Sequence, residues 1–194
     1  MSTLLLWPSS PIRVRDLNLI RKKDPRSWRL QSKWNGHRMI VSTHTPFYMN
    51  SRHGAPLSSA AKTDFSSACA RIFGLNCLID GELLLPGVSG VKKPEFVIYD
   101  LPVHCGLDLT GVNYAARLAI LSKYWTDFRD EFRIRVAHNI FITGLHTLDQ
   151  LEVMVQRSGT KLIEGVVAKN LADTLSWSRI SSVESTSQLK WRKE

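Results

Sequence analysis

The hexapeptide Lys33-Trp34-Asn35-Gly36-His37-Arg38 has the form Lys-x-x-Gly-x-Arg. It lies within residues 28–49, where the residue pattern predicts β-strands. Asn35 and Gly36 stand between two short strand-like runs, and both residue types tolerate the positive φ that a type I′ turn requires. The pattern therefore predicts a hairpin, with Lys33 beside its tight turn.

Further motifs that combine charged and apolar residues follow the hexapeptide. In chain order they are Asp80-Gly81-Glu82, Phe96-Val97-Ile98-Tyr99-Asp100, Glu164-Gly165-Val166-Val167-Ala168-Lys169 and Gln188-Leu189-Lys190-Trp191-Arg192-Lys193. Charged groups in an apolar strand are costly to bury without partners, so we expect Asp80 and Glu82 to have charged or hydrogen-bonding partners or a functional role.

Strand periodicity predicts which strand face each charged residue of the last two motifs occupies. Lys190 and Arg192 are separated by one residue, so one strand face carries both charges. Lys169 is an odd number of residues from Glu164, and a regular strand would place the two on opposite faces. We therefore rank Glu164 above Lys169 as a site residue.

The remaining pattern predicts an α+β fold with antiparallel strands. Helical spacing is expected around residues 15–22, 61–73, 114–124 and 148–155, and strands at 77–85, 95–101, 132–136, 165–169 and 188–192. Gly74 is expected to end the helix at 61–73, and one face of the helix at 114–124 is expected to carry Tyr114, Leu118, Leu121 and Trp125. Loops are expected at 86–94 and 171–186. No repeat or linker divides the chain, which is expected to form one domain.

Composition restricts the classes of partner. The 194 residues carry a formal net charge of +9, and a basic cluster before residue 30 favours a phosphate-rich partner, although a solvated basic face fits equally well. No apolar run reaches the ~20 residues that span a bilayer. There are three cysteines, Cys69, Cys77 and Cys105, and their odd number and wide spacing argue against a disulfide framework or a structural zinc. They are expected to be small buried residues in a reducing compartment.

Taken in this order, the motifs resemble those of covalent nucleotidyltransferases: ATP-dependent polynucleotide ligases, RNA ligases and mRNA capping guanylyltransferases. The resemblance extends from Gln31 to Arg192. It implies an ATP-grasp-like nucleotidyltransferase domain at residues 1–194, with a basic lead-in at 1–27 and no OB domain. It also implies ATP and Mg²⁺ as cofactors and a lysyl-AMP intermediate on Lys33.

The resemblance implies a role for each matched residue. Lys33 is the nucleophile, and Arg38, Lys190 and Arg192 assist at the phosphates. Glu82 binds the ribose, Tyr99 stacks on the purine, and Lys169 also contacts the nucleotide. Glu164 binds the metal. Gln31 approaches the adenine base, although an exposed strand residue is an equal interpretation. Arg52, in Ser51-Arg52-His53-Gly54, holds the 5′-phosphate of a nick.

Three positions depart from the ligase pattern. Asn35 replaces an aspartate, which removes a carboxylate near Lys33 and leaves the metal arrangement open. Arg192 replaces the second lysine of a Lys-x-Lys pair, and Gln188 stands where many ligases have tryptophan.

The function that these motifs favour is sealing of nicks between a 3′-hydroxyl and a 5′-phosphate in duplex DNA, as in DNA repair or replication. An RNA ligase acting on an RNA-containing duplex is the first alternative. A GTP-using capping enzyme and an inactive nucleic-acid-binding module are further ones. We expect a cytoplasmic monomer without a membrane partner.

Overall fold

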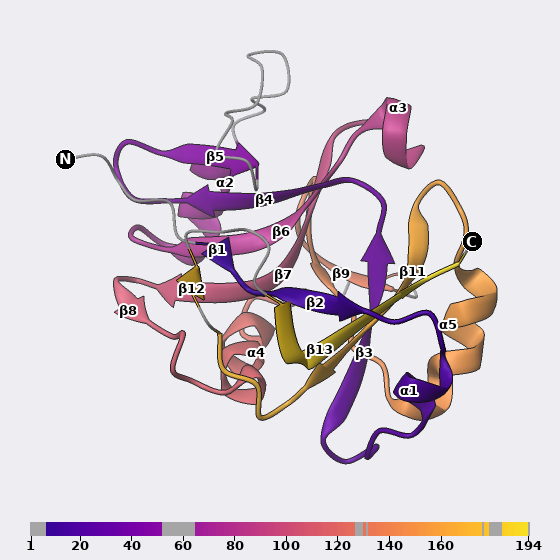
Figure 1. The fold of residues 1–194 in the computed structure, drawn as a ribbon. Helices are drawn as coiled ribbons and strands as arrows, with labels where there is room; N and C mark the ends of the chain where they lie inside the picture. The colour runs from indigo at the N-terminus through magenta and orange to yellow at the C-terminus, as the bar shows by residue number, and fades with distance from the viewer. Residues whose placement is uncertain are drawn as a thin grey trace.

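The structure, a computed structural model, describes residues 7–51, 65–126, 130, 132–175, 177–178 and 184–193. The fold is built around two main β-sheets (Figure 1). The larger sheet has the order β5-β4-β6-β7-β10-β9, with β8 paired to β7, and the smaller has the order β2-β13-β11-β3. Strands β1 and β12 form a separate two-stranded pair.

The strands of the larger sheet are β4 (His37–Ser42), β5 (Tyr48–Ser51), β6 (Leu78–Leu84), β7 (Glu95–His104), β8 (Leu107–Asp108), β9 (Arg133–Ala137) and β10 (Ile140–Thr143). Those of the smaller sheet are β2 (Ser10–Arg13), β3 (Trp28–Trp34), β11 (Ile163–Asn170) and β13 (Glu184–Arg192), and the separate pair is β1 (Trp7–Pro8) and β12 (Trp177–Ser178). The helices are α1 (Asn18–Arg21), α2 (Phe65–Phe73), α3 (Pro86–Ser89), α4 (Tyr114–Ser122), the 3₁₀ turn Leu148–Gln150 and α5 (Leu151–Arg157).

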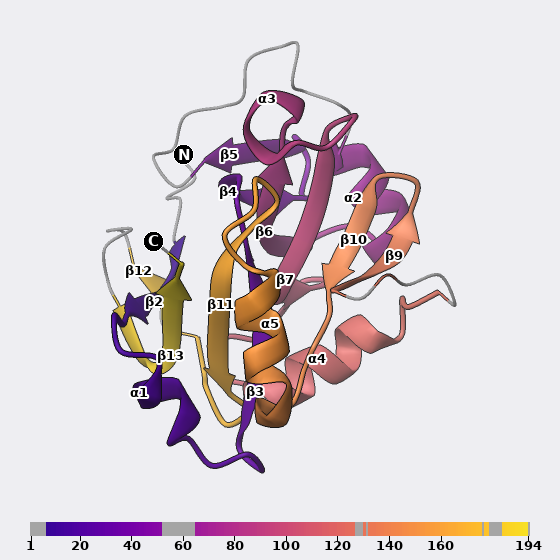
Figure 2. The ribbon, with the colours of Figure 1, turned by 90° about the vertical axis from the view of Figure 1, so that its right-hand side faces the viewer.

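Each sheet has its own helical cover. Helices α2 and α4 bury Phe65, Phe73 and Leu121 in one core with strands of the larger sheet. Helices α1 and α5 bury Ile20 and Met154 against the smaller sheet, and α5 runs beside β11 and β3 in Figure 2. Full burial of such a side chain contributes roughly 1.5–3 kcal/mol.

A third buried cluster joins the two sheets. Trp34 and Ile163 from the smaller sheet pack with Leu84, Val97 and Phe141 from the larger one. The Trp34 indole N–H also donates to Thr143 Oγ1 at 3.2 Å, from β3 to β10. These contacts fix the smaller sheet against the larger one at the point where the chain passes from β3 to β4.

The predicted α+β class and the antiparallel character of the sheets are confirmed. Two pairings are parallel, β10 with β7 and β13 with β2. The stretch expected as a basic lead-in contributes β2 to the smaller sheet and buries Val14 and Ile20. The segment expected as a loop at 86–94 begins with α3, and the one at 171–186 includes β12.

The predicted hairpin at Asn35-Gly36 is wrong. Strand β3 pairs with β11 and β4 pairs with β5 and β6, so the turn connects two different sheets. Neither turn residue has positive φ. Asn35 instead binds the segment before β11, through its N–H to Leu162 O and its side-chain amide to Lys161 O, both at 3.0 Å. Gly36 is required for close approach, because a Cβ there would collide with the Leu83 carbonyl oxygen.

Two smaller expectations also need correction. Cys105 is exposed rather than buried, whereas Cys69 and Cys77 are buried as expected. The buried face of α4 runs through Tyr114, Arg117 and Leu121, so an arginine occupies a place where the apolar pattern predicted Leu118.

Candidate active site

A pocket of about 350 Å³ opens between the two sheets. This volume is within the range of ligand sites, about 300–1,000 Å³. Residues from both sheets line this pocket. The lining residues that were predicted from the sequence to bind the nucleotide are Gln31, Lys33, Arg38, Glu82, Tyr99, Lys169 and Lys190. Strands distant in sequence therefore bring these predicted residues to one place.

Lys33, which lines this pocket, forms an ion pair with Glu164 on the neighbouring strand of the smaller sheet. Neither Glu164 nor Arg192 is among the residues that line the pocket. The Lys33 side chain is 26% exposed and that of Glu164 is 12% exposed. Arg192 Nη2 lies 3.6 Å from the other Glu164 oxygen. The pairing of β11 with β3 shifts register between Ile163 and Gly165, so strict alternation of faces fails at Glu164. For this reason the parity argument that separated Glu164 from Lys169 does not hold.

Arg38 is held by a two-pronged contact with Asp80. Its Nε and Nη2 donate to the two carboxylate oxygens at 2.9 and 2.7 Å, and Nη1 donates to Ser10 Oγ at 3.0 Å. Burial alone would lower the pKa of Arg38, but the Asp80 carboxylate outweighs it and holds that pKa above its ordinary value. Asp80 thus orients Arg38, which remains a fixed positive charge in the pocket wall.

Glu82 lies beside Tyr99 in the same pocket. The Tyr99 hydroxyl donates to Glu82 Oε2 at 2.9 Å. Burial raises the pKa of Glu82 to about 7, although the Tyr99 hydrogen bond and the charges of Lys33 and Arg38 oppose the rise. Asp80 adds to it. Near neutral pH this carboxyl group can therefore accept or donate a hydrogen bond.

The raised pKa of Glu82 predicts a pH-dependent stability. Between its ordinary pKa of 4.5 and the folded value of about 7, the folded state binds more protons than the unfolded state. Stability is then greatest below that interval and falls as pH rises through it. In the wild type, we expect the free energy of unfolding to fall by on the order of 2 kcal/mol between pH 5 and pH 8. Glu82→Gln should not show this fall. Urea denaturation at several pH values measures it.

Glu152→Gln is the matched control, because Glu152 is 58% exposed in its pair with Arg21. It should leave the pH dependence as in the wild type. If the stability of Glu82→Gln also keeps the pH dependence of the wild type, Glu82 has no raised pKa in the folded protein.

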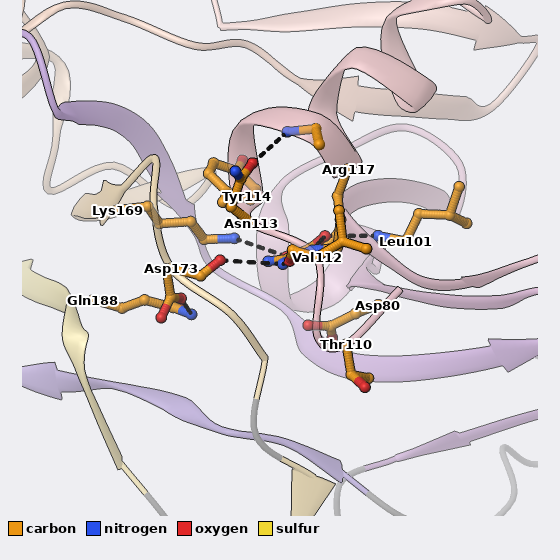
Figure 3. Close-up of polar contacts among 12 residues, drawn as sticks. Asp80, Leu101, Thr110, Val112, Asn113, Tyr114, Arg117, Lys169, Asp173 and Gln188 are labelled. Atoms are coloured by element: carbon orange, nitrogen blue, oxygen red, sulfur yellow. Dashed lines mark hydrogen bonds and ion pairs between the residues drawn. The ribbon is translucent and has the colours of Figure 1, made fainter. Parts of the chain in front are cut away.

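A buried polar network lies behind the pocket, around helix α4 (Figure 3). Arg117 is fully buried, and its Nε and Nη2 donate to the two oxygens of Asp100 at 2.8 and 2.9 Å. Lys169 Nζ lies 4.0 Å from Asp100 and 4.6 Å from the centre of the Tyr114 ring. The Gln31 side-chain amide donates to the Tyr114 hydroxyl at 2.6 Å.

Charge balance in this network follows from burial and pairing. Burial alone would raise the pKa of Asp100, but Arg117 and Lys169 hold it below its ordinary value. Burial lowers the pKa of Lys169, and Asp100 opposes this only in part. The network continues to β13, where the Gln188 amide donates to Asp173 Oδ2 at 2.7 Å. It connects pocket residues on both sheets to α4.

Some residues of the pocket and of the network behind it were predicted from the sequence, and others were not. Gln31 is buried rather than exposed, which removes one of its two interpretations. Arg117 and Asp173 were missed; the available signal was an arginine on the same helix face as Tyr114 and Leu121. Ser89 was also missed, and its hydroxyl donates to the Asn35 carbonyl at the sheet-to-sheet turn. Arg52 lies outside the described residues.

Solved structures of DNA ligases share this fold. The chain matches mycobacterial DNA ligase D complexed with ATP at a TM-score of 0.70 and 19% identity, over 99% of this chain and 62% of that one. A Lig E DNA ligase matches at 0.59 and 14%, over 95% and 69%. An archaeal ATP-dependent RNA ligase matches at 0.51 and 14%, over 95% and 48%.

No protein-family model matches the sequence, and a search of curated proteins finds no significant match. The fold is that of the nucleotidyltransferase domain of ATP-dependent DNA ligases. The chain spans about three-fifths of the length of the mycobacterial ligase D structures that it matches. Among the described residues, no helix is long and apolar enough to cross a membrane.

Proposed function

We propose that this chain is the nucleotidyltransferase domain of an ATP-dependent DNA ligase, which stores AMP on Lys33 and uses it to seal nicks. The observation that carries the proposal is the position of Lys33 in a pocket that also contains Arg38, Glu82, Tyr99, Lys169 and Lys190. The basic members suit a triphosphate, and the aromatic and acidic members suit a nucleoside. We further propose that it acts as a monomer in the cytoplasm, where a reducing environment would keep its cysteines free.

The chemistry requires a neutral Lys33 amine. In this structure the amine is paired with Glu164, so it must leave that carboxylate and lose a proton to solvent before attack. Lys33 Nζ would then form a bond to the α-phosphorus of ATP while the bond to pyrophosphate breaks. Arg38 and Lys190 would stabilise the charge that develops on the phosphate oxygens. AMP then passes to the 5′-phosphate, and the 3′-hydroxyl displaces it.

Glu164 would hold the divalent cation. Magnesium is commonly bound by one or two carboxylates together with substrate phosphates, and Glu164 supplies a partly buried carboxylate beside the nucleophile. Asp80 is committed to Arg38 and is a poorer candidate. When bound, the cation supplies Lewis-acid polarisation of the phosphoryl group.

Replacing Glu164 by glutamine should therefore reduce adenylation of Lys33 by about 10²–10³-fold, because the amide lacks the charge that the metal requires. Initial rates at increasing Mg²⁺ concentration measure this effect. Glu184→Gln, an exposed change on β13, should behave like the wild type. Full activity of Glu164→Gln at low Mg²⁺ would exclude Glu164 as the metal ligand.

The choice between DNA and RNA is tested with matched nicked duplexes. The two DNA ligases reported above match at higher TM-scores than the RNA ligase, which favours DNA. We expect faster sealing when the strand that supplies the 3′-hydroxyl is DNA. Faster sealing of the RNA-strand nick would establish the RNA ligase alternative, and labelling by GTP but not ATP would establish a capping-type enzyme.

Binding to nicked duplex should depend strongly on salt. Arg13, Arg15 and Lys22 are exposed, and Arg13 ends β2, the strand whose Ser10 and Pro11 line the pocket. If each contacts a phosphate, replacing all three by glutamine should lower the slope of log affinity against log salt by about 3, at ~0.9 per contact. Fluorescence anisotropy at several salt concentrations measures the slope. An unchanged slope would show that these residues form only a solvated face.

A further inference from the structure

Two sulfur atoms and an imidazole meet at the end of the larger sheet, away from the residues assigned to the nucleotide. One ligand atom each from Cys77, His104 and Cys105 lie within 4.8 Å of one another. Sequence spacing gave no sign of this cluster, because it forms only when β6 pairs with β7. Leu78 pairs with Val103, so Cys77 just before β6 meets the end of β7.

The backbone around this cluster is unusual. In the described part of the chain, the non-glycine residues with positive φ are Asn76 at 59° and Cys105 at 51°. Cys105 belongs to the cluster, and Asn76 directly precedes Cys77. Cys105 and Gly106 both have positive φ and form the two-residue turn between β7 and β8, where His104 pairs with Leu107. This turn places Cys105 beside Cys77.

The groups around the sulfur atoms favour a cation. The Cys105 N–H donates to Cys77 Sγ at 3.2 Å, which holds the two cysteines side by side. Both thiols point to the Phe73 carbonyl oxygen at the C-terminal end of α2, at 3.4 and 3.5 Å. The C-terminal end of a helix carries partial negative charge, which attracts cations.

A residue outside the cluster, Tyr124, orients the His104 imidazole. His104 Nε2 lies 2.8 Å from the Tyr124 hydroxyl. A hydrogen bond on one ring nitrogen is the usual way in which a protein orients a ligating histidine. Cys105 is exposed, so the cluster can be reached from solvent.

We propose that Cys77, His104 and Cys105 form a binding site for a thiophilic divalent cation of the zinc class. Atoms 2.3 Å from a tetrahedral centre lie about 3.8 Å apart, so the ligands need to close by about 1 Å at most. Water would complete the four ligands. On binding, the two S–H bonds are replaced by sulfur–metal bonds, and both protons pass to solvent. The site would link β6 and β7 beside the end of α2.

Titration of the reduced, metal-free chain with Co²⁺ tests the proposal without reference to ligase activity. We expect one equivalent to bind with a thiolate-to-cobalt charge-transfer band, and Zn²⁺ to displace it. Loss of an outer-shell partner typically weakens metal binding by about 10–100-fold. Cys105→Ser removes a direct ligand at an exposed position, and we expect it to weaken binding by about 100-fold or more.

Cys69→Ala is the matched control, because Cys69 is a buried cysteine outside the cluster. It should bind Co²⁺ as the wild type does, and the circular dichroism of Cys105→Ser should remain native. Three results would overturn the proposal: no stoichiometric binding, equal loss in both variants, or a Cys77–Cys105 disulfide in the purified chain with no metal bound after its reduction.

Discussion

Lys33→Ala should abolish formation of the protein–AMP adduct, by roughly 10⁴-fold or more, as expected when a covalent nucleophile is removed. The side chain is partly exposed and its contact with Glu164 is a single ion pair. Arg192 still faces Glu164 in the variant. The fold should therefore survive, with a change in unfolding free energy of only about 1 kcal/mol.

Incubation with ATP labelled on the α-phosphate, followed by a denaturing gel, measures this loss. Lys123→Ala, an exposed change after helix α4, should label like the wild type. Sealing of a nick that already carries AMP on its 5′-phosphate should persist in Lys33→Ala, because that step does not use the amine. Labelling of the alanine variant at the wild-type rate would refute the assignment.

Arg117→Met should have the largest effect on stability, a loss of about 3–5 kcal/mol in the free energy of unfolding. Arg117 is fully buried and makes a two-pronged contact with Asp100, which is itself buried. The methionine leaves that carboxylate with Lys169 at 4.0 Å as its remaining charged partner among the contacts described. Urea denaturation followed by circular dichroism measures the change.

Two further variants separate pairing from packing. Arg21→Met removes an exposed ion pair with Glu152 and should cost at most about 1 kcal/mol. Adding Asp100→Asn to Arg117→Met should recover part of the lost stability, because the buried charge is gone. If the double variant is no more stable than Arg117→Met, the cost comes from packing and not from an unpaired carboxylate.

The parts of the fold that depend on local pattern were predictable from the sequence. Alternation and apolar runs located β6 and β7, and Gly74 correctly predicted the end of α2. The hairpin at Asn35-Gly36 failed because a tight-turn signal does not specify which strands pair. Strand partners are set by long-range contacts, here between Trp34, Ile163 and the strands of the larger sheet.

The residues of the candidate site also divide into those that a local motif predicts and those that only long-range contacts bring together. Lys33, Arg38, Glu82, Tyr99 and Lys190 were found through their motifs, and they do line one pocket. Arg117 was missed because it lies in a helix with no motif, and its partner Asp100 is on a different element. The Cys77–His104–Cys105 cluster was missed for a similar reason, since only the pairing of β6 with β7 unites it.

Peptide mapping of the loaded wild-type chain will show whether Lys33 carries AMP. The chain is incubated with ATP and Mg²⁺, digested, and analysed by mass spectrometry at alkaline pH, where a phosphoramidate persists. We expect a single AMP adduct, on the lysine at position 33, that is lost in acid. An adduct on Lys169 or Lys190 instead, or none at all, would contradict it.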